Sequence, residues 1–133
     1  MRIVFVNHSR RKIGGVETYL DAIIPAVAAE HDVSFLYEGD PLGRDPIAFP
    51  QDAPTWDAAQ LGRSQTLHRL EQWKPDVCFV HGLEDSELEA SIVALGNGVL
   101  YVHNYYGTCI SGNKMVVNGV ARPCERQFGP ACL

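Results

Sequence analysis

The sequence predicts an α/β fold, in which a Rossmann-like parallel sheet carries helices on both of its faces. Short apolar runs, typical of buried strands, alternate with amphipathic runs whose apolar residues recur at helical spacing. A glycine pair, Gly14-Gly15, separates the first such strand from the first such helix. Right-handed connections between parallel strands complete the Rossmann-like arrangement. The 133 residues suffice for one domain with a core, so we expect a single domain over residues 1–133.

Residues 2–7 are apolar almost throughout and are expected to form a buried parallel strand. The helix that follows has apolar residues at helical spacing, namely Val16, Leu20, Ile23, Ile24 and Val27. Pro25 lacks a backbone donor and should kink or split this helix. Residues 33–37 form the second expected strand.

Four prolines mark residues 38–62 as a loop. At most, this loop holds short edge strands near residues 47–49 and 55–56, because proline cannot donate to a sheet. Ser64 is expected to cap the next helix, which ends at Lys74-Pro75 and has one apolar face made of Leu67, Leu70 and Trp73.

A further buried strand is expected at residues 77–81. The acidic residues after it, Glu84, Asp85 and Glu87, favour a helix start. The apolar stripe of that helix consists of Leu88, Ile92 and Leu95. Gly96-Asn97-Gly98 ends that helix, and residues 99–103 form the last clear strand. Beyond it, Asn118-Gly119 between residues 114–117 and 120–122 predicts a small hairpin.

The glycine pair predicts an anion site. A helix that starts in a glycine turn presents unpaired backbone N–H groups at the positive end of its dipole, and Arg10, Arg11 and Lys12 lie in the same loop. The segment is neither Gly-x-Gly-x-x-Gly nor a P-loop. Two structural alternatives stay open: the glycines let the helix start lie close to the sheet, and the cations are solvated.

Three histidines fall at the ends of expected strands. His8 follows the first strand, His81 ends the strand before Gly82, and His103 ends the last clear strand. In such sheets ligands bind beyond the carboxyl ends of the strands. We therefore expect the histidines and the glycine pair to gather at one edge.

The overall charge is acidic. A formal net charge of −5 argues against a nucleic-acid partner. No signal peptide and no run long enough to span a membrane is visible, so we expect a cytoplasmic protein with reduced cysteines. Spacing also disfavours a hydrolase, because Ser9 lacks a nucleophile elbow and the acids near Asp85 begin a helix.

Four segments, at residues 14–20, 30–33, 74–82 and 102–106, occur together in an order that resembles the N-terminal domain of family 4 glycosyltransferases. That resemblance covers nearly the whole chain and implies half of a two-domain GT-B fold. It implies retaining transfer of a sugar from a nucleotide-diphosphate donor to a sugar, polyol or lipid-linked acceptor, without a metal or other cofactor. Peripheral association with the inner face of the membrane stays open.

The resemblance also implies roles for particular residues. Gly14 and Gly15 would offer backbone N–H groups to the diphosphate or the transferring sugar, and His103 would position the donor sugar as the catalytic residue. Asn104 stands where the family often has aspartate. The other candidates for donor or acceptor binding are His8, Arg11, Glu17, His81 and Tyr105. Structural roles for Glu17 and Tyr105 stay open.

Cysteines mark residues 104–133 as an irregular insert. Cys78 lies in a strand, whereas Cys109, Cys124 and Cys132 surround the expected hairpin without zinc-knuckle spacing. Free thiols, a disulfide and a metal site stay open for these three.

We expect the chain to be a fragment that is inactive alone, because the nucleotide-binding domain that the resemblance implies is absent. A non-catalytic module that binds sugar or phosphate is the alternative. A flavodoxin-like signalling domain is disfavoured, since the first loop lacks paired aspartates.

Overall fold

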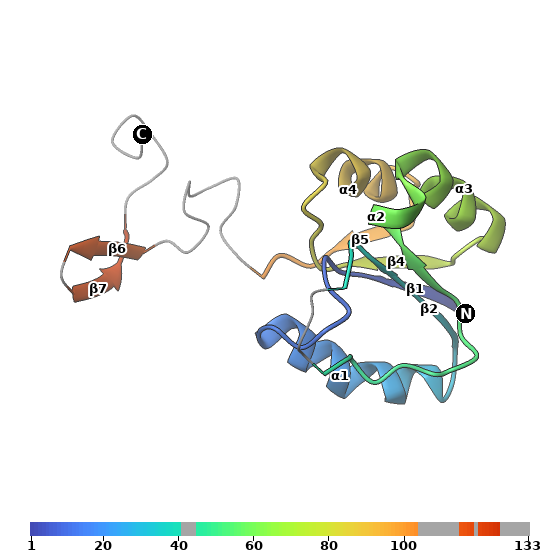
Figure 1. Ribbon diagram of the computed structural model, residues 1–133, viewed down its shortest axis with the longest axis horizontal. Helices are drawn as coiled ribbons and strands as arrows, with labels where there is room; N and C mark the ends of the chain where they lie inside the picture. Colours follow the sequence, from blue (N-terminus) through green and yellow to red (C-terminus); the bar gives the residue numbers. More distant parts are fainter. Residues whose placement is uncertain (41–44, 104–114, 119, 126–133) are drawn as a thin grey trace. The chain divides into compact units, whose positions relative to one another are not determined.

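A five-stranded parallel sheet organises the first of two units in the chain (Figure 1). The computed structural model describes residues 1–40, 45–103, 115–118 and 120–125. The first unit spans Met1–Tyr101 and the second Val102–Leu133. The strand order β3-β2-β1-β4-β5 is that of the first five strands of a Rossmann sheet. The α/β, Rossmann-like expectation is thus confirmed.

All five strands are parallel and short; they are β1 (Arg2–Val6), β2 (Asp32–Tyr37), β3 (Thr55–Asp57), β4 (Val77–Val80) and β5 (Gly98–Leu100). The central strand β1 pairs with β2 on one side and with β4 on the other. Its residues Val4, Phe5 and Val6 are at most 1% exposed, because helices cover both faces there.

Helix α1 (Gly15–Ala28) covers one face of the sheet, and α2 (Ala58–Leu61), α3 (Arg63–Trp73) and α4 (Ser86–Val93) cover the other (Figure 1). Successive strand residues point to opposite faces, so β1 feeds two cores. Phe5 packs with Leu20 and Ile24 of α1. Val4 and Val6 pack on the α3 and α4 side.

Helix α1 runs unbroken past Pro25, so the expected split is wrong. Pro25 lies in the last turn and removes a single bond, that to the Asp21 carbonyl, so the helix continues to Ala28. The N–H of Ala29 donates to the Pro25 carbonyl at 3.2 Å and closes the helix.

The connection from β2 to α3 differs from expectation in three places. The edge strand near residues 55–56 is confirmed as β3, but residues 47–49 form no strand, since only Pro46 makes an isolated bridge, to Arg11. Helix α2 was not expected. The Asp57 carboxylate caps it by accepting from Ala59 at 2.9 Å, which is why a helical turn forms there.

Helix α3 begins two residues earlier than expected. Gly62, not Ser64, is its N-cap, and the φ of Gly62 is +76°, a value that favours glycine. The helix ends at Trp73, and Lys74 follows in the left-handed region with φ of 52°.

The last helix and strand of the sheet are both shorter than predicted. Asp85 caps α4 as expected, but the helix ends at Val93, so Leu95 lies outside the apolar stripe and is 39% exposed. Strand β5 ends at Leu100 rather than at His103. It pairs with β4, which itself ends at Val80, and the last bond between them runs from the N–H of Tyr101 to the Val80 carbonyl.

In the second unit, β6 (Met115–Asn118) and β7 (Val120–Pro123) pair antiparallel around position 119. This pairing confirms the predicted hairpin. The state of Cys109 and Cys132, and that of Tyr105, lies outside the described residues.

Candidate functional site

The sheet has a topological switch point between β1 and β4. From β1 the chain first builds outward through β2 and β3, then returns to add β4 and β5 on the other side. Ligands of open α/β sheets bind beyond the carboxyl ends of the strands at such a point. Two residues occupy this position: Asn7 follows β1, and His81 follows β4. We call the region beyond these two strand ends the switch-point crevice.

Asn7 links the end of β1 to the loop and to the first turn of α1. It is fully buried, and its Nδ2 donates to the Ser9 carbonyl at 2.7 Å and to the Glu17 Oε1 at 2.9 Å. Its Oδ1 is buried and has no hydrogen-bond partner among the described residues. Buried polar atoms are rarely left unpaired, and an ordered water is a common partner for such an acceptor.

Glu17 ties helix α1 to the strand end. The carboxylate is 1% exposed, although it lies in the first turn of the helix, where most acidic side chains are solvated. One oxygen accepts from Asn7, and the helix dipole favours its charge at this end. A buried carboxylate that holds the turn between β1 and α1 supports a structural role for Glu17, and it places charge at the crevice.

The glycine pair lies at the N-terminus of α1 and is exposed. Gly14 is the N-cap, with extended backbone and no side-chain cap. A Cβ atom built on Gly15 would meet nothing within 4 Å, and one on Gly14 would meet only the Glu17 Oε2, at 3.4 Å. Neither close packing nor a positive φ therefore requires glycine here, which removes the main structural alternative for the pair.

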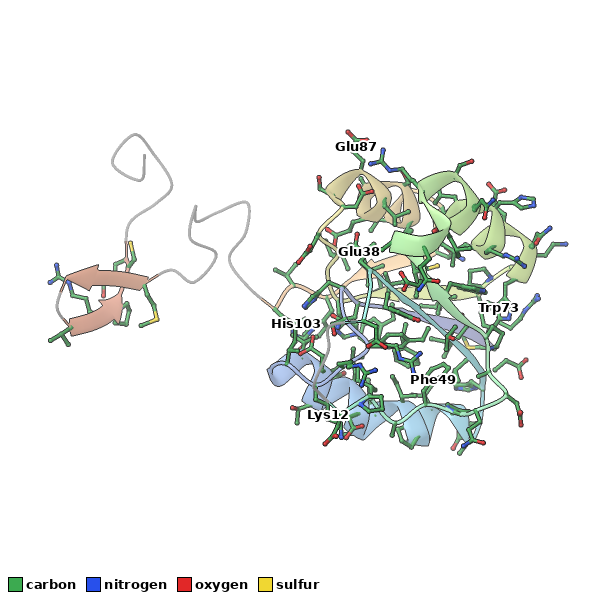
Figure 2. The ribbon with its side chains drawn as sticks, in the orientation of Figure 1. Lys12, Glu38, Phe49, Trp73, Glu87 and His103 are labelled. Carbon is green, nitrogen blue, oxygen red and sulfur yellow. The ribbon has the colours of Figure 1, made fainter. Side chains whose placement is uncertain are left out.

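Two of the three loop cations are paired with carboxylates of the protein. Arg11 pairs with Asp40, and its Nη2 lies 2.9 Å from the Oδ2; Lys12, labelled in Figure 2, lies 2.8 Å from the Asp21 Oδ2. The hydrogen bond from Arg11 lowers the pKa of Asp40, and that from Lys12 lowers the pKa of Asp21. The structure thus places the Arg11 charge on a carboxylate of its own chain.

His81 lies in an aromatic cluster that sequence reasoning missed. The imidazole is 6% exposed, and its ring centroid lies 4.2 Å from that of Phe79 and 5.9 Å from that of Tyr19. Tyr19 stacks with Tyr101 at 6.2 Å, and both tyrosines are at least 40% exposed. Tyr19 is a polar-face residue of α1 by its spacing, so only the register of α1 on the sheet could have revealed this contact.

The other histidines are placed differently. His8 is half-buried, and its carbonyl accepts from the N–H of Glu38 at 3.1 Å. His103 is exposed and belongs to the second unit, three residues beyond the end of β5. The structure therefore brings His8, His81 and the glycine pair to the carboxyl edge of the sheet, whereas His103 does not end a strand there.

Glu38 accepts hydrogen bonds from the backbone at the start of helix α4. It follows β2, where dinucleotide-binding folds often place an acid that binds ribose. Here its Oε1 accepts from the N–H of Asp85 at 2.9 Å, and its Oε2 accepts from the N–H of Glu84. The carboxylate thus holds the loop before α4, which disfavours a dinucleotide in this crevice.

The described residues include two cysteines, Cys78 and Cys124. No group of three or more His, Cys, Asp or Glu residues in the described parts of the chain is arranged to hold a metal ion. Burial raises the pKa of Cys78 to about 11, so this thiol is protonated at neutral pH and acts as a core residue. Cys124 is a half-buried free thiol.

Comparisons with models of known protein families, with curated proteins and with solved structures found no match. Among the described helices, none combines the length and the apolar character needed to cross a bilayer.

Proposed function

We propose that this chain forms the acceptor-side half of a retaining glycosyltransferase, and that the start of α1 binds the diphosphate of a nucleotide-sugar donor. The observation that carries the proposal is the open glycine pair. Two exposed glycines begin a helix, its N-cap Gly14 makes no side-chain cap, and within the described residues the fold requires glycine at neither position.

The fold alone does not favour glycine at position 15. Glycine in a helix is less stable than alanine by roughly 0.5–1 kcal/mol, and Gly15 is the first helical residue. A ligand that must approach the backbone closely supplies the missing reason, because any side chain would hold it away. The N–H groups and the helix dipole favour an anion there, and it would bind on the side of the turn away from the Glu17 Oε2, which lies 3.4 Å from the Cβ position of Gly14.

The crevice also suits a polyhydroxyl ligand. Tyr19 and Tyr101 offer exposed aromatic surface beside His81. Sugars have apolar ring faces, so this aromatic surface is useful to a sugar site. The further assignment of His103 to the donor sugar rests on the resemblance to family 4 glycosyltransferases.

Glycosyl transfer requires groups that stabilise the leaving diphosphate, and the start of α1 would provide such groups. In glycosyl transfer the bond from the anomeric carbon to the diphosphate breaks, the acceptor oxygen bonds to that carbon, and the acceptor proton is released. Negative charge then grows on the phosphate oxygens. Preorganised N–H groups at a helix start stabilise such charge, and removal of one such donor typically costs about 3 kcal/mol of barrier.

The test is a binding measurement on the chain, because the resemblance places the nucleotide on a second domain. UDP-glucose, GDP-mannose and inorganic pyrophosphate are titrated while backbone amide shifts are followed by NMR. We expect weak binding, with the largest shifts at Gly14, Gly15 and Val16, and weaker binding in Gly15→Ala. The matched control is Ser86→Ala, which changes the first residue of α4 instead.

The outcomes separate the alternatives. Shifts at the start of α1 that Gly15→Ala abolishes support the proposal. Absence of shifts there, or equal binding by Gly15→Ala and the parent, would rule out the diphosphate contact. In a protein that carries both domains, binding without turnover of any nucleotide sugar would favour a non-catalytic sugar- or phosphate-binding module.

A further inference from the structure

A cavity lies over the β2 and β3 edge of the sheet, where a loop takes the place of a helix. The described part of this loop, residues 38–40 and 45–54, crosses the face that α1 covers elsewhere. The cavity beneath it has a volume of about 270 Å³, and its lining includes Arg10, Phe35, Ile47, Phe49, Gln51 and Thr55. We call it the β2 cavity.

Hydrogen bonds hold the described part of the loop in place, so the β2 cavity is preformed. Its backbone is hydrogen-bonded to three separate elements: the Ile47 N–H donates to Arg10 O at 2.8 Å, the Ala48 N–H to Asp21 Oδ1 at 2.7 Å, and the Phe35 N–H to Pro54 O at 3.1 Å. Prolines at 46, 50 and 54 restrict the backbone further. Ligand sites in proteins are usually formed in advance in this way.

The floor of the β2 cavity is apolar and aromatic. Phe35 is 2% exposed and Ile47 is 6% exposed, while Phe49, labelled in Figure 2, meets Phe35 edge to face at 5.6 Å. Apolar cavities of roughly 150 Å³ accept benzene. A volume of about 270 Å³ therefore holds one ring and a substituent.

The rim carries one cation with no carboxylate partner in the described chain. Arg10 places its guanidinium 5.4 Å from the centroid of the Tyr37 ring, whereas the neighbouring cations Arg11 and Lys12 are paired with acids. Arg10 acts on Asp40 only through longer-range charge. Gln51 and Thr55 add polar groups to the same lining.

We propose that the β2 cavity is a second ligand site, which binds a small aromatic ring bearing one anionic group. The ring packs on Phe35 and Phe49, and Arg10 binds the anion. A carboxylate and a phosphate share this chemistry. The site is separate in its residues from the glycine pair, so the inference stands whether or not the transferase proposal holds.

The experiment titrates the chain with benzoate, phenyl phosphate and uncharged benzyl alcohol, and follows amide shifts at Gln51 and Thr55. Arg10→Gln removes the charge and leaves a shorter, polar side chain. Lys12→Gln is the matched control, because Lys12 lies in the same loop, is paired with Asp21 and does not line the β2 cavity. Ala53→Leu narrows the cavity with a larger apolar side chain.

We expect Arg10→Gln to weaken binding of both anions about tenfold and to leave benzyl alcohol unchanged, since a charged hydrogen bond is worth more than 1.4 kcal/mol. Lys12→Gln should change binding less than about twofold, and Ala53→Leu should block all three probes. Tighter binding of phenyl phosphate than of benzoate would identify phosphate as the better anion for this site. Equal binding of benzoate and benzyl alcohol, anion binding that survives Arg10→Gln, or no shift at Gln51 and Thr55 would overturn the inference.

Discussion

Two helices start at the carboxyl edge of the same sheet, and the protein treats their exposed N–H groups in opposite ways. Helix α4 is capped by Asp85, whose carboxylate accepts from the backbone N–H groups of Glu87 at 3.1 Å and Leu88 at 3.0 Å. The Glu38 carboxylate accepts from the N–H groups of Glu84 and Asp85. Helix α1 has Gly14 as its N-cap, which provides no side-chain cap.

The N-cap side chain of α4 accepts from backbone N–H groups at the helix start, whereas the N-cap of α1 has no side chain to do so. Both starts follow central strands, so position alone does not explain this difference. At α1 the nearest carboxylate, that of Glu17, turns inward to Asn7 and leaves the backbone of the glycine pair exposed. We infer that the α4 start is structural and that the α1 start is kept for a ligand.

The largest expected effect comes from breaking the anchor under α1. Glu17→Ala removes a buried carboxylate and leaves the Asn7 Nδ2 with the Ser9 carbonyl alone, so we expect the free energy of unfolding to fall by about 3 kcal/mol. Chemical denaturation measures it. Glu87→Ala is the control, because Glu87 lies in the first turn of α4 but is solvated; a comparable loss there would contradict the role given to Glu17.

A smaller loss should follow from opening α4. Glu38→Ala frees the N–H groups of Glu84 and Asp85, which water then solvates in part, so we expect about 1–2 kcal/mol of destabilisation. The same variant should gain pyrophosphate-dependent amide shifts at Glu84 and Asp85 that the parent lacks. Glu38→Gln keeps one acceptor oxygen, so its stability and its amide shifts should lie between those of the parent and Glu38→Ala. Identical amide shifts in the parent and in Glu38→Ala would show that Glu38 does not exclude anions.

Glycine at the start of α1 should trade stability for binding. Gly15→Ala has room for its Cβ, so we expect the free energy of unfolding to rise by roughly 0.5–1 kcal/mol while binding of pyrophosphate weakens. Thermal unfolding and NMR titration measure the two quantities. A variant that is both more stable and equally good at binding would leave the glycine pair without the role proposed for it.

Local patterns predicted much of the fold. The apolar runs gave the strands to within a few residues, and the acids at Glu84 to Glu87 marked the start of α4. The errors came from tertiary contacts. Strand β5 ends where its partner β4 ends, and α2 exists because Asp57 caps it, neither of which follows from periodicity.

The site was less predictable than the fold. The glycine pair is visible in the sequence, but its open surroundings are not. Asn7 carries no motif, and its importance appears only because the turn after β1 folds back to place Glu17 beside it. Likewise, the sequence shows three loop cations, whereas only the fold shows which of them meet Asp40 and Asp21.

The smallest effect should appear in the pH dependence of α4. The N–H of Leu88, and then the Arg63 guanidinium, lower the pKa of the Asp85 carboxyl in the folded state. Its contribution to stability is therefore complete above the ordinary carboxyl pKa of about 3.9 and is lost as the pH falls through the lower folded value.

Asp85→Asn isolates this contribution, because asparagine caps a helix about as well as aspartate but does not titrate. We expect the variant to be less stable than the parent at pH 7 and the gap to close as the pH falls below about 3.9, with urea unfolding as the measurement. Asp40 and Asp21 titrate in both proteins, so they cancel from the difference. A gap that stays constant to pH 3 would mean that Asp85 stabilises α4 by geometry alone, and the contrast between the two helix starts would then rest on Glu38.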